Sequence, residues 1–313
     1  MRSVVIFCTF IVYVFVVGAL ISPWIYELVQ LGKGSDIKFF EYLAGQKFGK
    51  ISNRCFMLAA AIGLYPMLKA FKAFNKKDLG YDLPRKEFLK EVGKGLPFGI
   101  ISLSILGCLI VYFGHRVMTP GMGPGDFIVA FLKMIPGAIA LAIIEETFFR
   151  GIVLNSMSRT LKVWPAILIS SFLFASVHLL RNKSDIVIAG DQWYHGFQYL
   201  GLTLNNFVDP GMAGSWLTLF ACGIFLSFVS LHYGNIARCM GVHMGWVLII
   251  KGYEKVTDGV SKGWMIGNYD KVTGYLAFII ISSICLVYWF IFLRKDKNKK
   301  PDENEEEQDP AIA

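Results

Sequence analysis

The sequence predicts an all-α protein that crosses a membrane about eight times. Hydrophobic residue types make up 55% of its 313 residues and charged types only 17%, whereas a soluble domain carries about 25% charged residues. The mean hydropathy is +0.52. Apolar runs of about 20 residues, long enough to cross a bilayer, recur along the chain. Because these runs follow one another almost without interruption, we expect one multi-span membrane domain over residues 1–297.

The apolar runs place the expected membrane spans in chain order. They lie at about residues 4–24, 55–70, 96–113, 127–157, 163–180, 215–232, 236–250 and 272–293. A cleaved signal peptide competes with a first helix, but its apolar core would be about 7–15 residues and would precede a small-residue cleavage site. The first run is longer and lacks such a site, so we expect an uncleaved helix.

The segments between the spans are polar or rich in glycine and proline. Residues 35–50 mix aromatics with lysines, which suits either an amphipathic interfacial stretch or a loop. The run TPGMGPGD at 119–126 should break the helix. Residues 181–214 are expected to form a loop, whose aromatic residues between Trp193 and Tyr199 suit an interfacial aromatic belt or, as the alternative, a guard of substrate entry. Residues 298–313 form an acidic tail that we expect to be disordered.

The net charge of +8 comes from basic residues between the spans. This placement indicates topology signals and contact with anionic lipid, and it does not indicate a nucleic-acid partner. With eight spans, the basic segments 69–94 and 294–300 lie on one side, which predicts that both termini are cytoplasmic. The short N-terminus without a sorting signal favours a bacterial inner membrane. The cysteines form no C-x-x-C pair, so a disulfide framework or zinc knuckle is not expected.

Two adjacent glutamates, Glu145 and Glu146, lie inside the fourth predicted span. Ionisable groups in spans are costly and usually functional. On a helix, Glu146 and Arg150 share a face and can neutralise each other. Glu145 points about 100° away, and the residue four positions after it is Phe149. Glu145 is therefore left free to act as a general base or acid. The alternative is that both glutamates pair with Arg150 and lock helices together.

Histidines lie in two further spans. His178 shares a helical face with Phe174, and His243 lies between Gly241 and Gly245, which permit close helix approach. A single histidine on an apolar helix is more often a packing residue than a catalytic one. One glutamate and two histidines in apolar surroundings, however, can bind a metal or activate a water directly. Both routes lead to hydrolysis inside the membrane.

Together these motifs resemble the CAAX-protease and bacteriocin-processing (CPBP, or Abi) family of intramembrane endopeptidases. The resemblance covers about residues 136–250 and rests on E-E-x-x-x-R, then F-x-x-x-H, then the glycine-flanked histidine. It implies an eight-helix membrane fold. It also implies an enzyme that cleaves a membrane protein, or a lipid-modified or hydrophobic peptide. It implies that Glu145 and His178 activate the attacking water and that His243 stabilises the oxyanion.

The resemblance gives Glu146, Arg150 and Phe174 supporting positions. It leaves the cofactor open: either none, or a divalent metal such as zinc that Glu145, His178 and His243 would hold.

One position departs from the family pattern. The third motif usually reads H-x-x-x-N or H-x-x-x-D, but the fourth residue after His243 is Val247, which cannot donate a hydrogen bond to an oxyanion. An inactive family member that acts as an immunity or scaffold protein is therefore an alternative. A proton-coupled transporter is another, because intramembrane Glu and His also build proton relays. Carriers often contain internal repeats, and the sequence shows no convincing one.

Overall fold

The structure is a computed structural model that describes residues 2–121, 123–180, 188–260, 264–267 and 272–293. The predicted tail at 298–313 lies outside these residues. In chain order the elements are α1 (Arg2–Gln30), α2 (Lys38–Ala44), α3 (Phe48–Phe71), α4 (Arg85–Tyr112), β1 (Arg116–Met118), α5 (Pro124–Glu146), the π-helix η1 (Thr147–Leu154), α6 (Asn155–Ser158), α7 (Val163–Leu179), α8 (His195–Leu204), the 3₁₀-helix η2 (Asn205–Phe207), α9 (Pro210–Tyr233), α10 (Ala237–Val256), β2 (Thr257–Gly259), α11 (Tyr275–Tyr288) and the π-helix η3 (Trp289–Leu293).

The fold is that of an all-α polytopic membrane protein, as predicted. Within the described residues, 6 helical stretches are long and apolar enough to cross a membrane: α1, α3, α4, the continuous stretch Ile128–Ser158, α9 and α11. Helix α7 is apolar but has 17 residues, and α10 is not among the 6. Both coincide with predicted spans, so the count of eight stays a prediction.

Several helices extend beyond their predicted spans. Hydropathy marks only the apolar part of a helix, whereas polar turns can continue it into the headgroup region. Helix α4 thus begins at Arg85, and its first turns contain four of the basic residues expected before the span: Arg85, Lys86, Lys90 and Lys94. The prediction of a loop over 181–214 is wrong for residues 195–204, which form α8. Buried Tyr199 and Thr203 anchor α8 against the rest of the protein, a tertiary effect that the sequence pattern does not carry.

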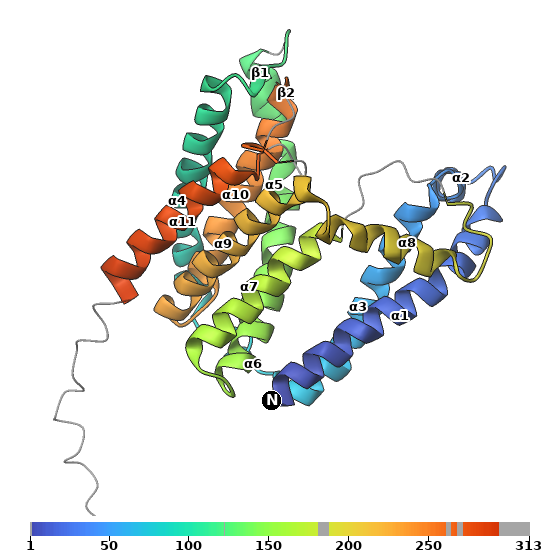
Figure 1. Ribbon diagram of the computed structural model, residues 1–313, viewed down its shortest axis with the longest axis horizontal. Helices are drawn as coiled ribbons and strands as arrows, with labels where there is room; N and C mark the ends of the chain where they lie inside the picture. Colours follow the sequence, from blue (N-terminus) through green and yellow to red (C-terminus); the bar gives the residue numbers. More distant parts are fainter. Residues whose placement is uncertain (1, 122, 181–187, 261–263, 268–271, 294–313) are drawn as a thin grey trace, which may run out of the picture.

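Figure 1 shows the helices in two groups. Helices α1 and α3 run side by side, with α8 against α1, while α4, α5, α7, α9, α10 and α11 form the larger group. Within the larger group α9 is central. Of its most apolar 18-residue segment 72% is buried, against 39% or less in the other candidate spans. The two groups meet where Phe7 and Phe10 of α1 pack against Phe148 of η1, at ring-centroid distances of 6.3 and 6.0 Å.

Helices α4 and α10 pack with their backbones in close contact. A Cβ atom added to Gly245 would lie 2.7 Å from the carbonyl oxygen of Leu96 and 2.8 Å from the amide nitrogen of Ile100. Gly241 likewise packs directly against the backbone of α4. The indole Nε1 of Trp246 donates a hydrogen bond to the Ser102 hydroxyl across the same interface, at 3.0 Å. The glycines that flank His243 therefore permit the close helix approach that the sequence predicts.

We expect Gly245→Ala to destabilise the protein by about 1–3 kcal/mol, because its methyl group overlaps backbone atoms that cannot move independently. Gly93→Ala on α4 is the matched control, since a Cβ there meets nothing within 4 Å. That variant should be neutral or more stable by up to about 1 kcal/mol, because alanine favours helix. Thermal unfolding of both purified variants in detergent measures the difference, and equal melting temperatures would contradict the prediction.

A short ribbon joins the far ends of the long helices. Strands β1 and β2 pair antiparallel, with Val117 opposite Asp258. The buried guanidinium of Arg116 donates to the Thr257 hydroxyl at 2.6 Å and to the Thr257 carbonyl, and its Cζ lies 5.2 Å from the ring centroid of Tyr253. These contacts fix the C-terminal end of α10 close to the segment that leads into α5.

Candidate active site

The helix that carries the two glutamates changes its geometry directly after them. Helix α5 ends at Glu146, and residues 147–154 form a π-helix rather than the continuous α-helix that the sequence predicts. In this π-helix the Phe149 carbonyl accepts a hydrogen bond from the Ser170 hydroxyl of α7 at 3.0 Å. Gly151 allows the backbone of Leu79 to approach, since a Cβ there would lie 2.5 Å from the Leu79 carbonyl oxygen. Such π-helical turns are rare and occur frequently at functional sites.

The predicted ion pair between Glu146 and Arg150 is present and fully buried. Nη1 of Arg150 lies 3.1 Å from Oε1 of Glu146, and both side chains are 0% exposed. Nη2 of Arg150 donates to the Gly223 carbonyl of α9 at 3.2 Å, and the Arg150 Cζ lies 4.6 Å from the ring centroid of Phe174. Arg150 therefore connects the π-helix to both α9 and α7.

The Glu146 carboxylate also fixes the orientation of His243. Its Oε1 lies 2.6 Å from Nδ1 of His243. A carboxylate only accepts hydrogen bonds, so Nδ1 carries the proton and donates it. Cys239, one helical turn before His243 on α10, is fully buried, and its thiol donates to the Ile236 carbonyl at 3.1 Å. Glu146 thus holds the His243 ring with its Nε2 atom on the opposite side.

Glu145 faces both histidines from the other side. Its Oε2 lies 3.6 Å from Nε2 of His178 and 3.7 Å from Nε2 of His243. This oxygen is buried and has no direct hydrogen-bond partner among the described residues, although the whole side chain is 16% exposed. Nδ1 of His178 donates to the Phe174 carbonyl at 2.7 Å, which leaves the Nε2 lone pair of a neutral His178 directed towards Glu145.

Phe174 packs between these groups. Its ring centroid lies 4.5 Å from that of His178 and 6.0 Å from that of His243. All the residues proposed from the sequence therefore lie in one cluster, built from α5, η1, α7 and α10. Their chemical roles stay predictions.

Sequence reasoning missed the residues that support this cluster. Cys239 could have been found from the sequence, because it lies four residues before His243 and so shares its helical face. The Ser170 hydroxyl donates to a carbonyl of the π-helix. The sequence does not predict this contact, because it does not predict the π-helix. Gly223 contributes a backbone carbonyl, for which no side-chain pattern exists.

The resemblance allowed for a metal ion held by Glu145, His178 and His243. Within the described part of the chain, no group of three or more His, Cys, Asp or Glu residues is placed to hold a metal ion. The residues as arranged do not fit a metal centre, and we derive no catalytic step through one.

Fold and site together define a polytopic membrane protein with a carboxylate between two histidines. A sequence model of the family described as "Type II CAAX prenyl endopeptidase Rce1-like" matches residues 127–249. This region is less than half of the chain, but it contains the whole cluster and Val247. Residues 127–249 are therefore similar to the Rce1-like family, which agrees with the resemblance to CPBP endopeptidases and supports a hydrolase of the intramembrane protease class. No curated protein and no solved structure matches the chain.

Proposed function

We propose that the protein is an intramembrane endopeptidase that hydrolyses a peptide bond of a membrane-associated protein or peptide. The observation that carries this proposal is the position of Glu145 Oε2, 3.6 and 3.7 Å from the Nε2 atoms of two histidines. Such separations are too long for direct hydrogen bonds, and they allow a water molecule to contact the carboxylate and a histidine at once.

The first step is activation of that water. A water about 2.8 Å from both Glu145 Oε2 and His178 Nε2 would find acceptors on both sides. It would donate a hydrogen to each, which directs a lone pair at the substrate carbonyl carbon. As the new C–O bond forms, Glu145 accepts the proton and acts as the general base.

The second step is stabilisation of the oxyanion by His243. Because its Nδ1 donates to Glu146, Nε2 can donate to an oxyanion only when the imidazole is protonated. Glu145, Glu146 and Arg150 leave the cluster with one net negative charge, and one imidazolium neutralises it. A protonated His243 therefore suits both the charge balance of the cluster and the developing charge of the intermediate. The intermediate then collapses, and Glu145 returns the proton to the leaving amine.

The apolar surroundings of the site support one substrate class. The site lies within an apolar helical stretch of the Rce1-like domain, so we propose a membrane protein or a lipid-modified or hydrophobic peptide as substrate. We also propose that both termini face the cytoplasm of a bacterial inner membrane. The test is hydrolysis of a quenched fluorescent peptide, farnesylated at a C-terminal C-a-a-X sequence, by the reconstituted protein. An unmodified peptide of the same sequence serves as the comparison, and equal hydrolysis by wild type and Glu145→Gln would exclude the proposal.

Val247 favours a second candidate, an inactive family member that acts as an immunity or scaffold protein. It lies one helical turn after His243 on α10, where the family pattern has Asn or Asp. The Glu145→Gln variant distinguishes the two candidate functions. It would retain full biological function if the protein acted without catalysis.

If the protein is a protease that lacks one oxyanion donor, Val247→Asn should raise the cleavage rate by about tenfold or more. One such donor is worth about 10²–10³ in rate where its geometry is ideal. Initial rates with the farnesylated peptide measure the effect. Val247→Leu controls for altered packing and should bring no gain, and an unchanged rate in Val247→Asn would show that the amide has no place in this site.

A further inference from the structure

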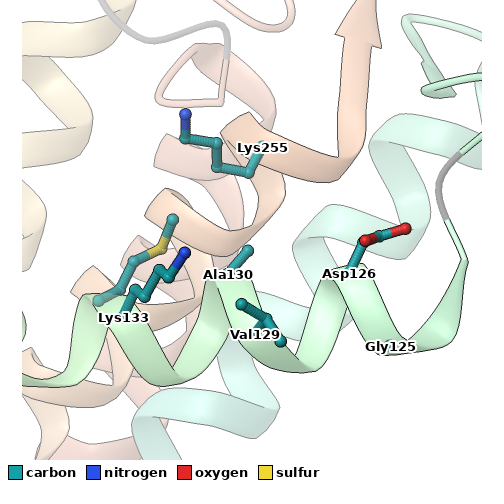
Figure 2. A pocket seen from close by; sticks show the side chains of 7 residues that line it. Gly125, Asp126, Val129, Ala130, Lys133 and Lys255 are labelled. Atoms are coloured by element: carbon teal, nitrogen blue, oxygen red, sulfur yellow. The ribbon is translucent and has the colours of Figure 1, made fainter.

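A cavity of about 600 Å³ lies at the opposite end of α5 from the glutamates (Figure 2). It is formed between the first turns of α5 and the last turn of α10. Its lining consists of Gly125, Asp126, Val129, Ala130, Lys133, Met134 and Lys255. It is open to the surroundings and separate from the candidate active site, because Lys133 precedes Glu145 by twelve residues, about 18 Å along a helix.

The charged groups of this cavity are not balanced. Among the described residues, neither Lys133 nor Lys255 pairs with a carboxylate. The nearby Lys251 does, since its Nζ lies 2.8 Å from Oε2 of Glu254. Asp126 accepts a hydrogen bond from the Gly123 amide at 3.1 Å, and it lies two helical turns from Lys133. Figure 2 shows Lys133 and Lys255 towards one end of the cavity and Asp126 towards the other. The lysine end therefore offers two free cations to an anion.

The position of Lys133 along α5 places this cavity at the headgroup level of a bilayer. The apolar stretch Ile128–Ser158 has 31 residues, or about 46 Å at 1.5 Å per residue. That exceeds the hydrocarbon core of about 30 Å and matches a bilayer with its headgroups, about 45 Å. Lys133 lies five residues inside one end of the stretch, about 8 Å from it.

The cavity also borders side chains that suit acyl chains. Ile128, Val129 and Leu132 of α5 are exposed by 56, 49 and 58%. A ligand with an anionic head and an apolar body would therefore contact lysines and lipid-facing side chains at once. A free phosphate ion would use only the lysines.

We propose that this cavity binds the phosphate group of an anionic phospholipid, with Lys133 and Lys255 as its ligands. The lipid would clamp the start of α5 to the end of α10, the two helices that carry Glu145 and His243. The proposal is independent of the protease function, because binding can be measured without turnover.

The test measures lipid binding to the purified full-length protein in a non-ionic detergent by native mass spectrometry. Phosphatidylglycerol, phosphatidylcholine and inorganic phosphate are titrated separately. We expect phosphatidylglycerol to bind more tightly than phosphatidylcholine. Lys133→Gln and Lys255→Gln should each weaken the first phosphatidylglycerol bound by about fivefold, and the double variant by about 25-fold.

Lys251→Gln is the matched control, since it removes a lysine from the same helix whose charge is already paired. It should change the affinity by less than about twofold. Wild-type affinity in the double variant, or no preference for phosphatidylglycerol in the wild type, would overturn the proposal. Displacement of the lipid by millimolar inorganic phosphate, with the same dependence on both lysines, would instead identify a site for free phosphate and also overturn it. If the double variant does not fold, the two single variants decide the question.

Discussion

Glu145→Gln should lower the rate of peptide hydrolysis by about 10³-fold, which corresponds to about 4 kcal/mol of transition-state stabilisation. Glutamine keeps the shape of the side chain but cannot accept the proton of the attacking water. The variant should fold normally, because the Oε2 atom that changes has no direct hydrogen-bond partner among the described residues. Its melting temperature should stay close to that of the wild type, since the substitution keeps the size of the side chain and breaks no direct hydrogen bond of Oε2 among the described residues. Initial rates with the farnesylated peptide, and thermal unfolding of the same sample, give both quantities.

Glu27→Gln is the matched control, because Glu27 is an exposed glutamate on α1, outside the cluster. It should leave the rate and the melting temperature unchanged. A Glu145→Gln variant that retains full activity would remove Glu145 from the mechanism. A variant that loses activity only because it unfolds would assign Glu145 a structural role instead.

The site was predictable where side chains recognise each other at helical spacing. The pairing of Glu146 with Arg150 follows from their four-residue separation, and it survives the change from α-helix to π-helix because neighbouring turns still contact each other. The likeness to a known family added the order in which Glu145, His178 and His243 occur. What pattern alone could not give is their approach within 4 Å, which depends on how α5, α7 and α10 pack.

The π-helix and α8 were beyond sequence reasoning for different reasons. Residues 147–154 have the apolar pattern of an ordinary α-helix, but they form a π-helix. Tertiary contacts accompany this wider helix, such as the hydrogen bond from Ser170 to the Phe149 carbonyl. The segment 195–204 looks polar enough for a loop, yet it forms α8 because Tyr199 and Thr203 are buried. Hydropathy placed each predicted span on a helix of the structure, 6 of them long and apolar enough to cross a membrane, but it placed the helix ends poorly, since polar helix ends carry no apolar signal.

Arg150→Met should destabilise the protein by about 3–5 kcal/mol, because it leaves the carboxylate of Glu146 buried without its cation. Both side chains are 0% exposed, so water cannot replace the guanidinium. The Gly223 carbonyl also loses a donor, which adds to the cost. A fall of about 10 °C in melting temperature, or a loss of monodisperse protein on size-exclusion chromatography, is the expected result.

Arg159→Met is the matched control, since Arg159 pairs with Asp78 and its side chain is 47% exposed, while that of Asp78 is 13% exposed. Because water reaches the Arg159 guanidinium, this pair should contribute about 1 kcal/mol, well below the loss expected for Arg150→Met. Equal losses in the two variants would contradict a special role for the buried pair.

The double variant Glu146→Gln/Arg150→Met separates the structural contribution of the pair from its catalytic contribution. With both charges removed, no buried charge is left unpaired, and most of the stability should return. Activity should not return, because a neutral amide at position 146 can no longer stabilise a protonated His243 through Nδ1. A stable double variant with wild-type cleavage would show that Glu146 and Arg150 serve only the fold, and that His243 needs no carboxylate partner to act on the oxyanion. A stable, inactive double variant would place the pair behind the catalytic histidine, acting through its orientation and charge.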